Sequence, residues 1–452
     1  MKNKTTVLKQ DSTREALDPV SNENRIFGLA TYIPFWISSM VAVQTFVVGQ
    51  NFLPPKGTLN STQGLTAAIL AGVIIAIMFV INANPGVKYG IPFIVQARSS
   101  FGYIGARYVS LIRVLPAMFW YGIGSWIGAS GLSYITEVFW GWSNSFVYFI
   151  LFMAFQTILA YFGIQTAKWF NTWLAIIIFT FFIYIDYKFL TVDEFVVTWS
   201  GAGSWGFPFI AAISAGVGTL LSAPVNIGDI SRYLKKGIGN NVTGHMVGIF
   251  PFHSIIIITG ILAAAATGIW DPIEALVSVI NSPAIALVFV IFVIASQVTT
   301  NLTLNIIPPA LQLTETFNIK WGLSTIIVGL LGIVTFPWVL FSSNVFNLFI
   351  NYYSAFIGPL LGILIADYYL IRKRELDINN LYHGGRKYHW LGIGSIVISG
   401  IVGMVFLEIS WIVALPLAVI IYVLGYQIIP SYKNELINLQ QKNYTEEKLL
   451  EE

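Results

Sequence analysis

The stretch ATYIPFWISSMVAVQTFVVGQNF, residues 30–52, constrains this chain more than any other segment. It is long and apolar enough to cross a bilayer, because about 20 such residues in a helix span the hydrocarbon layer. Polar or helix-breaking residues nevertheless interrupt it, namely Pro34, Ser38, Ser39, Gln44, Thr45 and Gln50. Hydrocarbon tolerates such residues only where protein or a water-filled cavity surrounds them. The segment therefore indicates a binding site inside a membrane protein.

Apolar runs of similar length recur along the whole chain, which has 452 residues, of which 56% are hydrophobic and only 10% charged. Soluble domains carry roughly 25% charged residues, so this composition excludes an ordinary soluble protein. We predict an all-α polytopic membrane protein with about 12 transmembrane helices. The runs lie at about residues 28–52, 64–84, 105–135, 144–163, 168–190, 206–233, 242–270, 280–308, 321–342, 343–371, 390–409 and 411–430. The absence of cysteine excludes disulfides and thiolate metal sites.

Basic residues collect on one side of the predicted spans. With both termini in the cytoplasm, the exterior loops hold only Lys56 and Lys188 among the Lys and Arg residues. The positive-inside rule therefore predicts two cytoplasmic termini. We expect residues 1–26 to form a cytoplasmic N-terminal tail without a cleaved signal peptide, and residues 431–452 to form a cytoplasmic C-terminal tail.

Spans one and six share an interruption. The sixth reads FIAAISAGVGTLLSAPVNIGDISRY, with Gly216, Gly218 and Pro224 in its middle. The two spans are five segments apart and run in opposite directions, and such a pair indicates an inverted repeat with a midplane binding site. The alternative is that Gly and Pro serve close helix packing. The matched pair favours the site.

The eighth span is unusually polar. Seven of ten consecutive positions carry hydroxyl or amide groups, namely Ser296, Gln297, Thr299, Thr300, Asn301, Thr303 and Asn305. Such groups are costly to leave facing lipid. Hydroxyl and carbonyl oxygens suit a small alkali cation. Interhelical hydrogen bonding is the alternative, but the density of polar groups favours contact with a cation or substrate.

The third span contains AMFWYGIGSWIGASG, in which Trp120 and Gly124 share one helix face. The indole ring beside this recess is suited to stacking on a planar heterocycle, although an aromatic beside glycines also serves packing. Arg113, about two turns below Trp120, is expected to be an interface anchor or to pair with a carbonyl group. Three further charged residues at span ends are expected to be structural or gating groups, namely Asp229, Arg232 and Asp367.

Several ordered motifs resemble the nucleobase-cation-symport-1 family, whose members include carriers of hydantoin, allantoin, cytosine and uracil. The motifs are YGIPFIVQARSSFGYIGA (89–106), FWYGIGSWIGA (119–129), NIGDISRYLK (226–235), TTNLTLNIIPP (299–309) and SAFIGPLLGILIADYYLIRKR (354–374). The resemblance implies a leucine-transporter-like fold, a five-plus-five inverted repeat followed by two additional helices. The repeats would occupy residues 27–190 and 206–371, and the additional helices residues 390–430.

The resemblance also implies a sodium site. Its ligands would be the carbonyl oxygens of Ser38, Val41 and Ser296, completed by the hydroxyl groups of Thr299 and Thr300. The family pattern is intact at all five positions. Because some relatives use protons, H+ remains the alternative coupling ion.

The implied substrate positions match less well. Trp120 and Asn305 coincide with a stacking tryptophan and a substrate-binding asparagine of the family. Elsewhere the chain departs from the pattern, with Gly124 in place of a glutamine, Leu220 beside Gly218 and Thr219 in place of a second tryptophan, and Ala42 in place of an amide. Candidate replacements are Gln44, Gln297 and Asn301. The pocket is therefore expected to be roomier and less polar than that of a hydantoin carrier.

Together these features predict a multi-pass symporter of the plasma membrane that imports a small planar nitrogen heterocycle with Na+. The expected partners are the substrate, the coupling cation and the bilayer, with no nucleic acid. A proton-coupled carrier of the same fold, for a vitamin or amino acid, is one alternative. A channel or an intramembrane enzyme is another, but the sequence contains no nucleophile–base pair or paired catalytic carboxylates, so no enzyme is expected.

Overall fold

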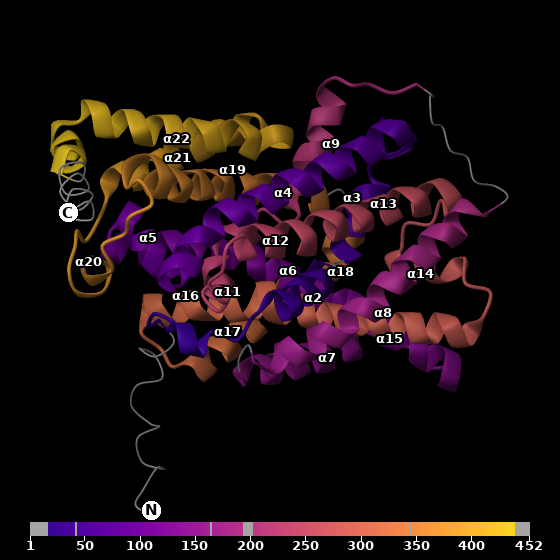
Figure 1. The fold of residues 1–452 in the computed structure, drawn as a ribbon. Helices are drawn as coiled ribbons and strands as arrows, with labels where there is room; N and C mark the ends of the chain where they lie inside the picture. The colour runs from indigo at the N-terminus through magenta and orange to yellow at the C-terminus, as the bar shows by residue number, and fades with distance from the viewer. Residues whose placement is uncertain (1–16, 41–42, 163–164, 193–201, 343–344, 439–452) are drawn as a thin grey trace, which may run out of the picture.

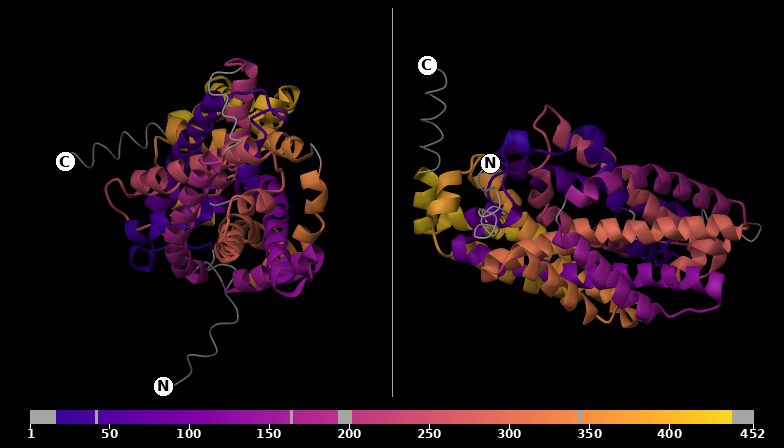
Figure 2. Two further views of the ribbon diagram at one scale, coloured as in Figure 1. Left: turned by 90° about the vertical axis from the view of Figure 1, so that its right-hand side faces the viewer. Right: turned by 90° about the horizontal axis from the view of Figure 1, so that it is seen from below.

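The computed structural model describes residues 17–40, 43–162, 165–192, 202–342 and 345–438. This part of the chain is helical, apart from one isolated β-bridge between Phe27 and Leu234. The long helices lie roughly along one axis, which runs across Figure 1 and toward the viewer in the left view of Figure 2. The prediction of an all-α membrane protein is confirmed.

In the described residues, the first half of the bundle contains seven α-helices after a short 3-10 helix (Asn22–Asn24). In chain order they are α2 (Leu29–Met40), α3 (Val43–Gln50), α4 (Ser61–Tyr89), α5 (Phe93–Phe101), α6 (Tyr103–Trp140), α7 (Ser145–Tyr161) and α8 (Gln165–Leu190). A capping box between Asn60 and Gln63 begins α4, and the left-handed Gly90 ends it. Such caps satisfy backbone groups that the first and last turns leave unpaired.

The second half begins with the short helices α9 (Phe207–Gly218), α10 (Ser222–Val225) and α11 (Gly228–Ser231). It continues through α12 (Asn240–Gly248), α13 (Phe250–Thr267), α14 (Pro272–Ser278), α15 (Pro283–Thr300), a π-helix (Asn301–Ile306) and α16 (Ile307–Phe317). It closes with α17 (Trp321–Ile333), α18 (Pro337–Ser342), α19 (Val345–Ile365) and a second π-helix (Ala366–Ile371). After these come α20 (Ile378–His383), α21 (Trp390–Val405) and α22 (Ser410–Ile428).

Among the described residues, six continuous helical segments are long and apolar enough to cross a membrane. They are Ser61–Tyr89, Asn240–Thr267, Pro283–Phe317, Trp321–Val339, Val345–Ile371 and Leu407–Ile428. Helices α2 and α3 pass the same test as one span bent by 52°, and α7, α9 and α21 are shorter apolar helices. With 38 residues, α6 is about 57 Å long and exceeds the bilayer core. These elements are consistent with about twelve spans.

The break expected in span six is present. Helix α9 ends at Gly218, and only two short helices follow it before Arg232. Two backbone carbonyl groups at this break accept hydrogen bonds from neighbouring spans, as a membrane interior requires. The hydroxyl of Tyr353 donates to the carbonyl oxygen of Gly218, and Asn82 Nδ2 donates to that of Pro224 at 2.7 Å. The chain therefore remains unwound here without leaving these groups unpaired.

Ion pairs gather at the end of the bundle that carries α5 and α20 (Figure 1). Glu315, at the end of α16, accepts from Arg98 on α5 at 2.7 Å and from Arg107 on α6 at 3.3 Å. Lys88, at the end of α4, pairs with Glu375 at 2.6 Å. Lys88, Arg98 and Arg107, three of the basic residues that the sequence analysis placed on the interior side, thus lie at the same end of the molecule.

Candidate functional site

Oxygen atoms from α2 and α15 meet in the middle of the bundle. The hydroxyl oxygen of Thr299 lies 2.9 Å from the carbonyl oxygen of Ser296 and 3.4 Å from that of Ser38. The hydroxyl of Thr300 donates to the carbonyl oxygen of Ser39 at 3.1 Å. All these residues are at most 2% exposed. Hydroxyl and carbonyl oxygens are the donors that Na+ prefers, so the residues present fit the cation.

A small chamber of about 30 Å³ lies beside these oxygens. The broken span one, α6, the broken span six and the π-helix after α15 all contribute to its wall. Its lining residues are Gln44, Thr45, Arg113, Trp120, Thr219, Leu220, Ser222, Ala223, Thr300, Leu304 and Asn305. About 30 Å³ is the space of a single water molecule in the liquid, so the chamber is contracted relative to a heterocyclic ring.

Five substrate positions predicted from the sequence therefore lie together, namely Gln44, Trp120, Thr219, Leu220 and Asn305. Sequence reasoning did not assign Arg113, Thr45, Ser222, Ala223 or Leu304 to the wall. A signal for Ser222 and Ala223 was available, because both lie in the interruption of span six. For Leu304 the signal was its position next to Asn305.

Trp120 is held among aromatic rings of α19. Its ring centroid lies 5.5 Å from that of Phe349, 5.8 Å from that of Phe346 and 6.3 Å from that of Tyr353. All three pairs are edge-on, an arrangement that leaves the rings fixed without stacking them face to face. Span ten thus positions the indole ring at the chamber wall.

Gly124 allows two amides to approach α6 closely. A Cβ atom at this position would lie 2.8 Å from Asn301 Oδ1 and 2.9 Å from Gln44 Nε2. The family pattern has a glutamine at this position. In this chain the amides of Gln44 and Asn301 lie beside the space that its side chain would occupy. Gln44 also lines the chamber, and its Oε1 is buried without a hydrogen-bond partner among the described residues.

Arg113 is fully buried and connects three spans. Its Nε donates to Asn226 Oδ1 at 2.9 Å, and its Nη2 donates to the carbonyl oxygen of Leu304 at 2.7 Å. That carbonyl would normally accept from the N–H of residue 308, but Pro308 has none. The carbonyl partner expected for Arg113 is therefore present, and Pro308 explains why it is available.

The remaining predicted residues lie around the chamber rather than in its wall. Asn301 faces α6 and α7, and Gln297 Nε2 donates to Ser296 Oγ at 3.3 Å. Gly218 ends α9 next to Thr219. Val41 and Ala42, a predicted cation ligand and a predicted substrate contact, lie outside the described residues.

The three charged residues expected at span ends are held by local partners. Asp229 accepts from the backbone N–H of Phe93 at 2.9 Å and from Gln312 at 3.2 Å. The ring of Tyr233 lies under the guanidinium group of Arg232 at 4.9 Å. Asp367 pairs with Arg372 at 2.9 Å.

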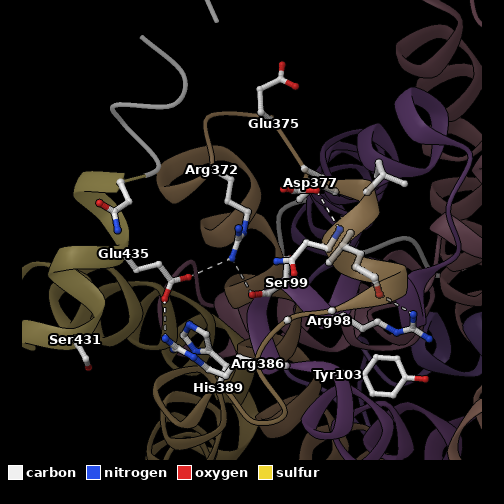
Figure 3. A pocket seen from close by; sticks show the side chains of 18 of the residues that line it. Arg98, Ser99, Tyr103, Arg372, Glu375, Asp377, Arg386, His389, Ser431 and Glu435 are labelled. Carbon is white, nitrogen blue, oxygen red and sulfur yellow. Dashed lines mark hydrogen bonds and ion pairs between the residues drawn. The ribbon is translucent and has the colours of Figure 1, made fainter. Parts of the chain in front are cut away.

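A larger cavity of about 740 Å³ opens at the end of the bundle near α5 and α20 (Figure 3). Arginines line it, but carboxylates hold them. Arg372 pairs with Asp367 at 2.9 Å, and Arg386 pairs with Glu435 at 3.0 Å. Figure 3 shows Glu435 between the two guanidinium groups. This cavity is lined by the loop after the second π-helix and by the segment after α22. It shares no lining residue with the small chamber, and the broken helices expected at a transport site do not contribute to it.

The sequence is similar to those of known membrane permeases. A family model described as "Permease for cytosine/purines, uracil, thiamine, allantoin" matches residues 19–428. The hydantoin permease of Microbacterium maritypicum is 27% identical, over 84% of this chain and 81% of its own. The allantoin permease of Bacillus subtilis is 25% identical, over 93% of this chain and 95% of its own.

A solved structure has the same fold. It is a nucleobase-cation-symport-1 family transporter in a closed conformation with bromovinylhydantoin bound. It superimposes with a TM-score of 0.82 at 24% identity, and the match covers 91% of this chain and 94% of the other. The predicted leucine-transporter-like fold is thereby confirmed. This chain belongs to the nucleobase-cation-symport-1 family, and it is a membrane transporter rather than an enzyme.

Proposed function

We propose that this transporter is a secondary active symporter that imports a small planar nitrogen heterocycle, such as a nucleobase, a hydantoin or allantoin, together with Na+. The observation that carries the proposal is the meeting of Thr299 with the carbonyl groups of Ser38 and Ser296 next to the chamber. A cation there and a substrate in the chamber would share the interface between spans one and eight.

The cation would be held by the carbonyl oxygens of Ser38, Val41 and Ser296 and by the hydroxyls of Thr299 and Thr300. Bound Na+ would supply a positive charge that attracts oxygen atoms of both spans. Among the described residues, the hydroxyls of Thr299 and Thr300 already lie within 3.4 Å of carbonyl oxygens of α2, which supports a site shared by the two spans. Cation and substrate would then favour the same arrangement of the two spans, so each would raise the affinity of the other by an equal factor.

The substrate would be held by stacking on Trp120 and by hydrogen bonds to Asn305 and Gln44. Base–aromatic stacking accepts many ring systems, whereas amides select the pattern of donors and acceptors. Leu220 occupies the position at which the family pattern has a second stacking tryptophan. It would cover the face of the substrate ring opposite to Trp120. An aliphatic side chain there supports a preference for substrates with an apolar substituent.

The orientation proposed here places both termini in the cytoplasm and the protein in the plasma membrane. The concentration of basic residues near α5 and α20 supports it, since such residues favour the cytoplasmic face. The two inverted repeats would span residues 27–190 and 206–371, with residues 390–430 as additional helices.

Uptake into proteoliposomes tests the proposal. Labelled uracil, hydantoin and allantoin are each offered with an inward Na+ gradient, with K+ in its place, and with a protonophore. We expect saturable accumulation of at least one of them that requires the Na+ gradient. Accumulation that ignores Na+ and collapses with the protonophore would instead establish proton coupling. Equilibration without accumulation would indicate a channel.

A further inference from the structure

A chain of amides runs from α7 to the chamber. It starts at Gln156, which is 0% exposed and does not line the chamber. Gln156 Nε2 donates to the carbonyl oxygen of Phe152 at 3.2 Å and to Ser125 Oγ at 3.0 Å. A carbonyl oxygen only accepts hydrogen bonds, so this contact fixes which end of the Gln156 amide is the nitrogen. Its Oε1 therefore faces the other way, toward Asn301.

The second amide repeats the same logic. Asn301 Nδ2 donates to Gln156 Oε1 at 2.8 Å, and it also lies 3.4 Å from the carbonyl oxygen of Tyr121. Both partners are acceptors, so the nitrogen of Asn301 must point to them. Asn301 Oδ1 then accepts from Asn305 Nδ2 at 3.0 Å. The order of donors and acceptors is thus set from Gln156 outward.

The third amide is at the chamber wall. Asn305 Nδ2 is turned toward Asn301, so the Asn305 Oδ1 atom points away from it. Asn305 lines the chamber, and its Oδ1 has no hydrogen-bond donor among the described residues. Asn301 and Asn305 both lie in the π-helix, four positions apart. Short π-helical segments are frequent at functional sites, where they redirect side chains. Here the segment places the two amides in contact while one of them reaches the chamber.

We propose that Gln156 is a positioning residue that acts through Asn301 to keep the Asn305 carbonyl oxygen available to the substrate. The site then selects ring systems that present an N–H group at this point, as lactams and cyclic imides do. This inference rests on the proposed function. Gln156 itself never touches the substrate, and its contribution is the orientation of an amide that does.

A purely structural role for these bonds would be to join spans three, four and eight. Both roles predict that removing Gln156 lowers stability, because it leaves a buried amide without its partner. They differ in selectivity. Without Gln156, Asn301 keeps only a 3.3 Å contact to the Ser125 hydroxyl, which can donate or accept, and a long 3.4 Å contact to the carbonyl oxygen of Tyr121. If Gln156 sets the orientation of Asn305, its loss therefore makes reversal of both amides easier, and the preference for N–H over N-alkyl substrates falls.

The test measures dissociation constants of the full-length purified protein in Na+ buffer. The ligands are uracil, hydantoin and allantoin, each compared with its N-methylated derivatives. In Gln156→Leu we expect the affinity for the best N–H ligand to fall about tenfold, the effect of about one hydrogen bond. The affinity for its N-methyl derivative should stay the same or rise. The selectivity ratio therefore drops, although the fold and the cation response persist.

Thr157→Val is the matched control, because Thr157 is the next residue of α7 and bonds to Tyr121 Oη at 3.1 Å without belonging to the amide chain. It should leave the selectivity ratio unchanged. A Gln156→Leu protein whose affinities for N–H and N-methyl ligands fall by the same factor would overturn the positioning role. Failure of the wild-type protein to bind any of these heterocycles would instead contradict the proposed function. If Gln156→Leu does not fold, Asn301→Leu provides the same comparison one link closer to the chamber.

Discussion

The hydroxyl oxygen of Thr299 lies 3.4 Å from the carbonyl oxygen of Ser38, across the interface between α15 and α2. The next hydroxyl along α15, that of Thr300, approaches the next carbonyl along α2, that of Ser39, at 3.1 Å. Two adjacent oxygen pairs thus join the helices. Each hydroxyl group has one proton and donates it to one oxygen. A cation bound among the oxygens would therefore add an electrostatic attraction that the two hydrogen bonds do not supply.

Replacing both hydroxyl groups should abolish the response to Na+. In Thr299→Ala/Thr300→Ala we expect the Na+-dependent rise in melting temperature to disappear, because a cation that binds only the folded protein stabilises it by mass action. Circular dichroism should show an intact helical fold. The control is Thr325→Ala, since within the described part of the chain Thr325 bonds to its own helix α17, at the carbonyl oxygen of Gly322 at 2.9 Å. Undiminished Na+ stabilisation in the double variant would refute the assigned cation site.

Removing the indole ring of Trp120 should weaken substrate binding. We expect Trp120→Ala to lose about 1–3 kcal/mol of binding free energy, the usual contribution of stacking between a base and an aromatic side chain. Trp120→Phe should lose less, because a ring remains. Calorimetric titration measures both. Trp126→Ala is the control, since Trp126 packs on Phe149 and Trp338 elsewhere along α6. Equal affinity in the wild type and Trp120→Ala would remove this ring from the site.

A methyl group at Gly124 should disturb the amides beside it. A Cβ there would lie 2.8 Å from Asn301 Oδ1, which is closer than packed atoms normally approach. We expect Gly124→Ala to lower both substrate affinity and stability, the latter by about 1–3 kcal/mol as in other overpacked sites. Gly394→Ala is the matched control, because no atom lies within 4 Å of its added methyl group. That change should be neutral or stabilising by about 1 kcal/mol, as alanine favours the helix.

The guanidinium group of Arg113 should be needed for its geometry as well as its charge. Arg113→Met leaves the carbonyl of Leu304 and the amide of Asn226 without their donor, a loss of about 1–3 kcal/mol for each buried group left unpaired. Arg113→Lys offers one compact donor in place of a fork and should be intermediate. Thermal unfolding and uptake are measured together, with the exposed Arg374→Met as control. An Arg113→Met protein with wild-type stability and uptake would contradict this assignment.

Much of the architecture was accessible from composition and pattern. Apolar runs indicated the spans, and Gly216, Gly218 and Pro224 located the break in span six, where α9 does end at Gly218. Pro34 was less informative. Helix α2 continues through it, although Pro34 is the sixth residue of the helix and cannot donate to the carbonyl oxygen of Ala30.

Contacts between distant segments were less accessible. The order of donors and acceptors along Gln156, Asn301 and Asn305 depends on backbone carbonyl groups of α6 and α7, which no sequence spacing reveals. The π-helix is another such feature, since it arises where Pro308 removes a helical hydrogen bond and Arg113 replaces it. The sequence contained both residues but gave no reason to connect them.

The burial of Gln156 one layer behind the chamber bears on how transporters of this family diverge. The evolution of a new substrate preference need not change any side chain that contacts the substrate. A substitution at such a supporting position would change the orientation of the amide that does contact it. Two carriers with identical inner walls would then accept different compounds. Comparisons of relatives that consider only the innermost residues would overlook this difference.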